Sequence, residues 1–498
     1  MQFKNFSDGY RTNNITVNSL SAGYNVELLN TPYGRNIYRS NGNTLVKQVP
    51  NNEKIIGGFD YEKGDTHYEL IFTNSGTESK AYLFFNETLT LIKGGMSEDA
   101  RFFNAVNYNN GAFITNGIDA PFFYEYGASP AIINIDCVSY TDVQIRGLAI
   151  KVFDNRIFIG SGHELFSCGL GDPTDWSSSD VETTRAGYID NFMNRSSSIK
   201  SIETYKNSLM IYRTTDTVRL NGTSGSYEMD VISNVGTSSP FSVTNLDDYQ
   251  IYFLKHINGV GVYYISANEL GTIKAESEIS TFIHEEFANI DNTRLDEIYV
   301  IANTKKNEVW IHIPRTDYPN NSYWIIYNLT AKCFFPPRIT QPITSAWLFN
   351  GEIYIGTADG KVLKEDSGNT FDGNTISFSA DTCSMDFNTL VKKEFDEQCR
   401  YTLDGKKQNN FILSFIKNDD ERTIISKEIV AVPNGCLIWA KDDKATDLKY
   451  FWGHNFAGTT PLISKCGKPS SFSTLKIRFS GTGDLGILNF ELQNPKLA

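Results

Sequence analysis

The segment that comes closest to a nucleotide-binding motif is Gly356-Thr-Ala-Asp-Gly360-Lys361. A phosphate-binding loop has four residues between its two glycines and opens a helix, whose amides help to hold the phosphate. Here three residues separate the glycines, and the alternation of apolar and polar residues after Lys361 predicts a strand. The segment is therefore interpreted as the turn of a β-hairpin, for which Asp-Gly is a strong signal.

The histidines and clustered carboxylates show no spacing typical of a metal or catalytic site. His284-Glu285-Glu286 has no second histidine one helical turn away, as a zinc protease motif requires. The acidic clusters at 247–248, 419–421 and 442–443 lack the central glycine and terminal glutamate of a calcium loop. Each of the six histidines is interpreted as an ordinary structural or surface residue: His67, His163, His256, His284, His312 and His454. The sequence therefore predicts no catalytic, metal-binding or cofactor-binding residues, and neither an enzyme nor a cofactor.

Glycan recognition or cleavage is the alternative function. Two carboxylates from distant loops can cleave a glycosidic bond without leaving a local motif. Propellers of the sialidase type repeat the turn Ser-x-Asp-x-Gly-x-Thr-Trp. The nearest segment, Gly171-Asp172-Pro173-Thr174-Asp175-Trp176, does not match that turn.

Composition narrows the class of protein further. The net charge of −13 argues against a protein that coats nucleic acid, because phosphate binding needs clustered Lys and Arg. The seven cysteines are scattered and odd in number, which favours reduced thiols: Cys137, Cys168, Cys333, Cys383, Cys399, Cys436 and Cys466. No secretory signal or membrane span is expected, so the chain is expected to be made in a reducing cytoplasm.

The elements that carry these residues are predicted to be the strands of a β-propeller. A polar turn, an apolar strand, a Gly/Asp/Asn turn and a second apolar strand recur about every 40–50 residues, the period of propeller blades. The units fall at 54–95, 100–140, 145–190, 197–235, 239–275, 293–338 and 342–366. We expect an all-β protein with about seven blades, six being the alternative. One helix is also predicted, over 277–290, with Ser280 as its N-cap.

The predicted domain organisation has three parts. Residues 1–53 form an N-terminal arm that can complete the propeller, and residues 54–366 form the propeller itself. Residues 367–498 contain short strands without the blade spacing, which indicates a C-terminal β-sandwich-like domain.

The middle of the chain resembles the tail hub or nozzle proteins of short-tailed phages, also described as tail tubular or packaged-DNA-stabilisation proteins. The resemblance covers residues 145–365 most clearly and extends to the C-terminal strands. It rests on these segments: Arg156-Ile-Phe-Ile-Gly-Ser-Gly162, Glu164-Leu-Phe-Ser167, Gly171-Asp-Pro-Thr-Asp-Trp176, Ser208-Leu-Met-Ile-Tyr212, Val235-Gly-Thr-Ser-Ser-Pro240, Ile251-Tyr-Phe-Leu254 and Leu475-Lys-Ile-Arg-Phe479.

This resemblance implies a structural protein of the virion tail, assembled in the host cytoplasm. It would form a homohexameric ring below the portal and its adaptor ring, and would anchor fibres or spikes. The ring would retain the viral DNA and then conduct it during ejection, without sequence-specific binding.

Overall fold

The computed structural model describes residues 8–13, 19–31, 34–127, 130–136, 144–176, 186–189, 196–223, 226–256, 259–267, 273–387, 389–395, 399–403, 409–431, 437–439, 450–452, 462–466, 470–491 and 496–497. The chain forms two compact units. The propeller unit comprises residues 43–324 and 340–368, and the sandwich unit comprises residues 1–42, 325–339 and 369–498. Within the described ranges, every helix is too short or too polar to cross a membrane.

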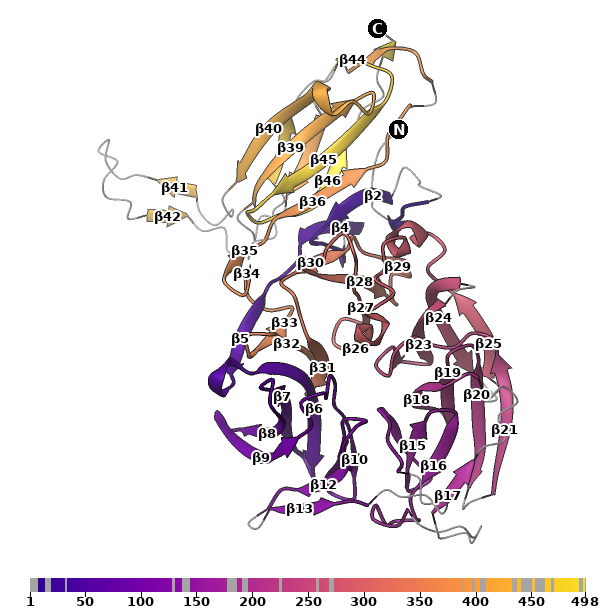
Figure 1. Ribbon diagram of the computed structural model, residues 1–498. Coiled ribbons are helices and arrows are strands. Elements are labelled where there is room, and N and C mark those ends of the chain that lie inside the picture. The colour runs from indigo at the N-terminus through magenta and orange to yellow at the C-terminus, as the bar shows by residue number, and fades with distance from the viewer. Residues whose placement is uncertain are drawn as a thin grey trace. The chain divides into compact units, whose positions relative to one another are not determined.

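The propeller is built from seven antiparallel sheets, of which six have four strands and one has five (Figure 1). The first blade contains β6 (Lys54–Lys63), β7 (Thr66–Asn74), β8 (Ser79–Phe85) and β9 (Thr88–Met96), and the second contains β10 (Asn104–Tyr108), β11 (Gly111–Thr115), β12 (Phe122–Glu125) and β13 (Ala131–Asn134). The third blade contains β14 (Ala149–Phe153), β15 (Arg156–Ser161), β16 (Glu164–Ser167) and β17 (Gly187–Ile189), and the fourth contains β18 (Ile199–Tyr205), β19 (Ser208–Arg213), β20 (Thr217–Thr223) and β21 (Ser226–Ser233).

The fifth blade contains β22 (Val243–Leu246), β23 (Tyr249–His256), β24 (Gly259–Ala267) and β25 (Ile273–Glu278). The sixth contains β26 (Tyr299–Asn303), β27 (Glu308–Ile313), β28 (Ser322–Asn328) and β29 (Cys333–Phe334). The seventh contains β31 (Ser345–Phe349), β32 (Glu352–Gly356), β33 (Lys361–Glu365) and β5 (Asn43–Gln48). In the sixth sheet, β28 continues into residues that belong to the sandwich unit, and β30 (Arg338–Thr340) also pairs with β28. The predicted all-β fold and its seven blades are therefore confirmed.

Tight turns join the first and second strands of several blades. Asn109-Asn110 and Asp154-Asn155 both have positive φ at two successive residues, and Asn350-Gly351 does the same in the last blade. Two central residues of positive φ define the type I′ turn, whose twist matches the twist of paired strands. Asn, Asp and Gly tolerate this conformation, which explains why these residue types mark the repeat in the sequence.

The core lies between neighbouring blades, and a recurring tyrosine joins them. The hydroxyl of Tyr61 donates to the backbone oxygen of Asn110 in the next blade, at 2.6 Å. Tyr108 does the same to Asn155 at 2.9 Å. Tyr205 repeats the contact with a turn residue of the fifth blade, at 2.6 Å. The end of an inner strand is thus tied to the first turn of the following blade.

The last blade is closed by a strand from the other end of the sequence. β5 pairs antiparallel with β33, with Leu45 opposite Leu363. The turn that precedes β33 also accepts a bond from the arm, because the Val49 amide donates to the Gly360 carbonyl at 2.9 Å. This pairing links residues that are more than 300 positions apart in the chain, and it closes the ring of blades.

The sandwich unit contains two main sheets that mix the two ends of the chain. The first has the order β1 (Gly9–Tyr10), β2 (Ser19–Tyr24), β36 (Phe378–Thr382), β45 (Leu475–Gly481), β39 (Asn409–Lys417) and β40 (Ile424–Ala431). The second has the order β3 (Val26–Thr31), β4 (Gly34–Arg39), β46 (Gly486–Glu491), β38 (Cys399–Leu403) and β43 (Leu462–Cys466). Smaller pairings join β34 (Thr370–Phe371) to β35 (Asn374–Thr375), β41 (Leu437–Trp439) to β42 (Tyr450–Trp452), and β37 (Lys393–Glu394) to β44 (Ser470–Phe472) and β47 (Lys496–Leu497).

Two expectations differ from this structure. The predicted helix over 277–290 is wrong: β25 extends to Glu278, and only the short 3₁₀ helix η2 (His284–Phe287) follows. Ser280 is not its N-cap, because its hydroxyl accepts the Val262 amide of the neighbouring strand at 3.0 Å. The predicted arm of 1–53 is divided between the units, since β1 to β4 pair within the sandwich unit and β5 pairs within the propeller.

Candidate functional site

A cavity of about 560 Å³ lies on the axis of the propeller. Its wall includes residues of the first strand of every blade, from β6, β10, β14, β18, β22, β26 and β31. Because all seven blades contribute, this cavity is the central channel that the closed ring of sheets creates. Because residues of every blade line it, we take this cavity as the candidate functional site.

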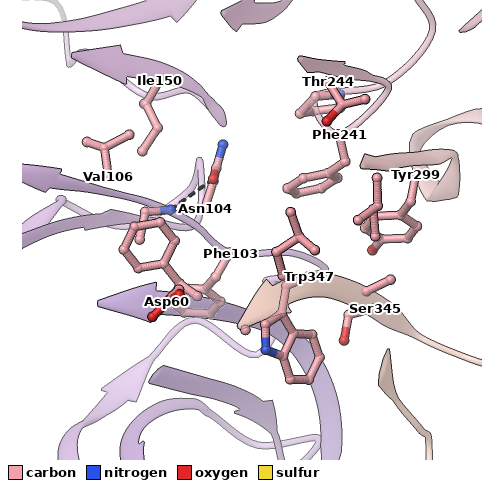
Figure 2. Close-up of a pocket in the computed structure, with 18 of the residues that line it drawn as sticks. Asp60, Phe103, Asn104, Val106, Ile150, Phe241, Thr244, Tyr299, Ser345 and Trp347 are labelled. Atoms are coloured by element: carbon pink, nitrogen blue, oxygen red, sulfur yellow. Dashed lines mark hydrogen bonds between the residues drawn. The ribbon is translucent and has the colours of Figure 1, made fainter. Parts of the chain in front are cut away.

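Several aromatic residues line the cavity, and their rings are held by packing (Figure 2). The Phe103 ring stacks on Phe72 with centroids 4.6 Å apart and planes 5° from parallel. Phe241 stacks on Tyr299 with centroids 5.2 Å apart. Phe72, Phe103 and Tyr299 are almost fully buried, and the stacking of these rings stabilises the inner strands that surround the cavity.

Gly58 on β6 makes room for the Trp347 ring. A Cβ at Gly58 would lie 2.1 Å from a ring atom of Trp347, far inside contact distance. The indole nitrogen of Trp347 donates to Oε1 of Glu69 at 3.1 Å. The ring thus lies against a bare stretch of backbone and is oriented by a buried carboxyl group.

The polar side chains of the cavity join neighbouring blades to one another. The amide of Asn107 donates to the Asp60 carbonyl at 3.0 Å, and its oxygen accepts the Glu62 amide at 3.1 Å. Lys151 and Glu203 form an ion pair at 2.5 Å between the third and fourth blades. These groups are satisfied by one another, so their first role is to hold the inner strands in register.

An acidic group with one histidine lies on the first blade, beside the cavity. Asp60 accepts from Nδ1 of His67 at 2.8 and 3.0 Å, and it also accepts the Asn350 amide at 2.8 Å. The hydrogen bond to Asp60 raises the pKa of His67. Burial raises the pKa of Glu69 to about 8, and the nearby charge of Asp60 adds to that effect. Sequence spacing does not reveal this group, since Glu62 and His67 meet only across a hairpin.

The segments considered for chemistry serve structural purposes where the structure describes them. Gly356–Lys361 forms a hairpin turn, as predicted: the Thr357 amide donates to the Lys361 carbonyl at 3.1 Å, and Gly360 has a φ of 80°. In the 171–176 turn, Asp172 accepts from Thr174, and Trp176 is buried against the second and third blades.

The acidic clusters and histidines are distributed without a common centre. The pair at 247–248 lies in a turn, where Lys206 contacts Asp248 at 2.5 Å. In the 419–421 cluster, Glu421 bonds to Arg478 at 2.9 Å. Residues 442–443 and His454 lie outside the described residues. Of the histidines, only His67 lies within the acidic group of the first blade.

Three cysteine side chains that the structure describes are buried: Cys168, Cys333 and Cys383. Burial raises the pKa of Cys168 to about 12 and that of Cys383 to about 11. A thiol that stays protonated is a poor nucleophile and a poor metal ligand. Cys137 and Cys436 lie outside the described residues.

Comparisons with known proteins describe only the fold of this chain. No protein-family model matches it, and no curated protein matches it either. Among solved structures, the Pan2 WD40 domain of Neurospora crassa is similar with a TM-score of 0.36 and 9% identity, covering 67% of this chain and 97% of that one. The WD40 β-propeller domain of Doa1 has a TM-score of 0.38 and 10% identity over 66% and 96% of the two chains. The designed protein Ika8 has a TM-score of 0.38 and 10% identity over 65% and 99%.

Proposed function

We propose that this protein is a structural subunit of the tail of a short-tailed phage. In this role, copies of the chain assemble into a homohexameric hub or nozzle below the portal and adaptor ring. The ring retains the genome, conducts it during ejection and anchors fibres or spikes. The resemblance of residues 145–365 to such proteins suggests this role, and the β-rich propeller and sandwich are compatible with it.

The observation that carries the proposal is a set of exposed apolar side chains on two outer strands, which we call the outer-strand surface. Leu91 on β9 is 53% exposed, and Ile132 and Ile133 on β13 are 43% and 44% exposed. A hydrogen bond of 2.7 Å from Lys93 to Asn134 joins the two strands, so these side chains belong to neighbouring blades. Exposed apolar side chains beside a free strand edge are typical of a surface that another chain covers.

The dimensions of the axial cavity bear on the path of DNA. A cavity of about 560 Å³ is too small to admit a DNA duplex. DNA that passes through the assembly would therefore run between subunits and not along the propeller axis. A closed ring of identical subunits provides such a passage. The net charge of −13 would keep contact with the phosphate backbone weak.

The first experiment measures assembly of the full chain. Mass photometry and negative-stain microscopy would be applied to the purified protein, alone and with the portal and adaptor proteins of the same phage. The expected result is a six-fold ring with an open centre. A chain that stays monomeric under all of these conditions contradicts the proposal.

A pair of variants tests whether the outer-strand surface makes the contact. Ile133→Glu places a charge on that surface and is expected to abolish the ring. Ile118→Glu is the matched control, because Ile118 is 45% exposed but lies in the turn between β11 and β12. Loss of the ring in both variants, or in neither, contradicts the assignment of this surface.

Glycan binding is the second candidate function. It is favoured by one observation, the combination of aromatic rings with Asp60 and Asn104 in a single cavity. Trp347 is only 6% exposed and Tyr299 only 3%, so little of either ring remains open to a sugar. The ring proposal is therefore preferred. A glycan array combined with a hydrolase screen separates the two, because clear binding or turnover would favour the glycan function.

A further inference from the structure

Asp60, Glu62 and His67 bring three metal-ligand atoms together on the first blade. One oxygen of each carboxylate and one ring nitrogen of His67 lie within 4.8 Å of one another. Within the described part of the chain, this is the one group of at least three such side chains that meets that criterion. From this group and the buried carboxyl group beside it, we propose a binding site for a divalent transition-metal cation of the Zn²⁺ or Mn²⁺ class.

The strand register explains why these side chains meet. Asp60 lies directly opposite Glu69 on the β6–β7 pair, and Glu62 lies directly opposite His67. Side chains of directly opposed residues share a face of the sheet, and residues two apart on one strand share it as well. The four side chains therefore project from the same face, at the end of β6 where the hairpin turns.

The donor atoms lie near enough to bind a single small cation once the proton shared by His67 and Asp60 is lost and Glu62 shifts. Two ligand atoms that each lie about 2.1 Å from a zinc ion can be at most about 4.2 Å apart. Nδ1 of His67 lies 2.8 Å from an oxygen of Asp60 and 3.9 Å from an oxygen of Glu62. Glu62 is the exposed member of the group, so its carboxylate can move to complete the site. One imidazole and two carboxylates are a ligand set that suits Zn²⁺ or Mn²⁺.

Glu69 provides a second and independent observation. Its side chain is fully buried, and its Oε2 atom has no hydrogen-bond partner. It lies directly across the strand pair from Asp60, on the same face. A buried carboxyl oxygen without a partner is unfavourable unless the group keeps its proton or a cation lies near it. A divalent cation beside Asp60 would satisfy this group and would offset the excess of negative charge on this face.

A hydrogen bond to Oδ2 of Asp60 orients this carboxylate for binding a metal ion. The Asn350 amide donates to Oδ2 of Asp60 at 2.8 Å. The His67 ring packs edge-on against Phe349, with centroids 6.4 Å apart. Hydrogen bonds and packing behind the ligands commonly set their orientation in metal sites. Both contacts come from the last blade, so the proposed site also connects the first and last blades of the ring.

The test uses the full chain after treatment with a chelator. Titration calorimetry with Zn²⁺ and with Mn²⁺ would measure affinity and stoichiometry, and the visible spectrum of added Co²⁺ would report direct nitrogen and oxygen ligation. We expect one ion per chain in addition to any weak surface binding. Glu62→Gln is expected to weaken binding at least about tenfold and His67→Ala at least as much, because each removes a ligand.

Controls separate this site from other outcomes. Glu62 is exposed, so Glu62→Gln should leave the circular dichroism spectrum unchanged and remain informative if His67→Ala folds poorly. His163→Ala is the matched control, since it removes a partly exposed histidine on another blade and should bind as the unmodified chain does. No saturable uptake of either metal would overturn the proposal. Uptake that is equal in Glu62→Gln and in the unmodified chain would overturn it as well. Neither result depends on ring assembly.

Discussion

The stability of the propeller is expected to fall between pH 7 and pH 5 because of His312. This side chain is 3% exposed, and its Nδ1–H donates to the Glu297 carbonyl at 2.8 Å. The rings of Trp324 and Tyr299 pack beside it, with centroids 5.2 and 6.0 Å from the imidazole. Burial lowers the pKa of His312 to about 4, because the loss of hydration outweighs the hydrogen bond and the charge of Glu297, which both favour the imidazolium.

The sign follows from the two pKa values. The unfolded chain binds the proton near pH 6.5, and the folded chain binds it only near pH 4, so unfolding takes up a proton in between. Stability contributed by the neutral His312 is therefore complete above pH 6.5 and is lost as the pH falls toward 4. The linkage relation predicts a loss of about 2 kcal/mol between pH 7 and pH 5, and about 3 kcal/mol by pH 4.

Urea unfolding followed by tryptophan fluorescence provides the assay, because Trp310 and Trp324 are buried within the same blade as His312. The measurement compares the unmodified chain with His312→Gln at pH 7 and pH 5. The variant should lose about 2 kcal/mol less over this interval. His256→Gln, a half-buried histidine at the end of β23, should keep the original dependence. Equal pH dependence in the unmodified chain and His312→Gln would refute the reasoning.

Three substitutions test the packing of the blades by the same unfolding assay. Gly58→Ala should destabilise the protein by about 1–3 kcal/mol, because the new Cβ would lie 2.1 Å from a ring atom of Trp347. Arg315→Met should cost about 3–5 kcal/mol, because Arg315 pairs with the buried Glu286 at 2.9 Å and the carboxylate would lose that partner. Tyr108→Phe should cost about 1 kcal/mol through loss of the bond to the next blade.

Each of these predictions has a matched comparison. Gly94→Ala should be close to neutral, since the nearest atom to its new Cβ lies at 3.4 Å on a flexible glutamate. Glu286→Gln combined with Arg315→Met should cost less than the sum of the single changes, because no buried charge is left unpaired. Tyr264→Phe should change stability little, because Tyr264 makes a ring contact but the structure gives its hydroxyl no hydrogen bond. Additive costs in the pair, or equal costs in the two tyrosine variants, would contradict these explanations.

Local signals in the sequence were sufficient to predict most of the strands. A hairpin depends on neighbouring residues: alternation places one face inward, and Asn, Asp or Gly permits the positive φ of the turn. This is why the predicted unit of 145–190 coincides with β14 to β17, and the unit of 197–235 with β18 to β21. The 277–290 prediction failed because apolar residues at helical spacing also suit an irregular segment that buries Ile283 and Phe287 separately.

The candidate sites could not be predicted in the same way. The axial cavity exists only because seven inner strands converge, and no single segment of the sequence supplies all of its lining residues. His67 was interpreted as an ordinary structural or surface residue, since no ligand spacing surrounds it in the sequence. Its partners became visible only through the β6–β7 register and through the Asn350 amide, which is 290 positions away from Asp60.

The sequence by itself determined that the chain is built from β-hairpins repeated at the blade period, because that information is carried by residues close together in the chain. Tertiary structure decided how the ends are used. β5 enters the last blade, while β2 and β4 pair with the C-terminal strands β36 and β46. A strand edge accepts any partner of suitable register and apolar face, so local sequence does not specify which distant strand will fill it. By contrast, Asp60, Glu62, His67 and Glu69 share one face through the register of the local β6–β7 hairpin.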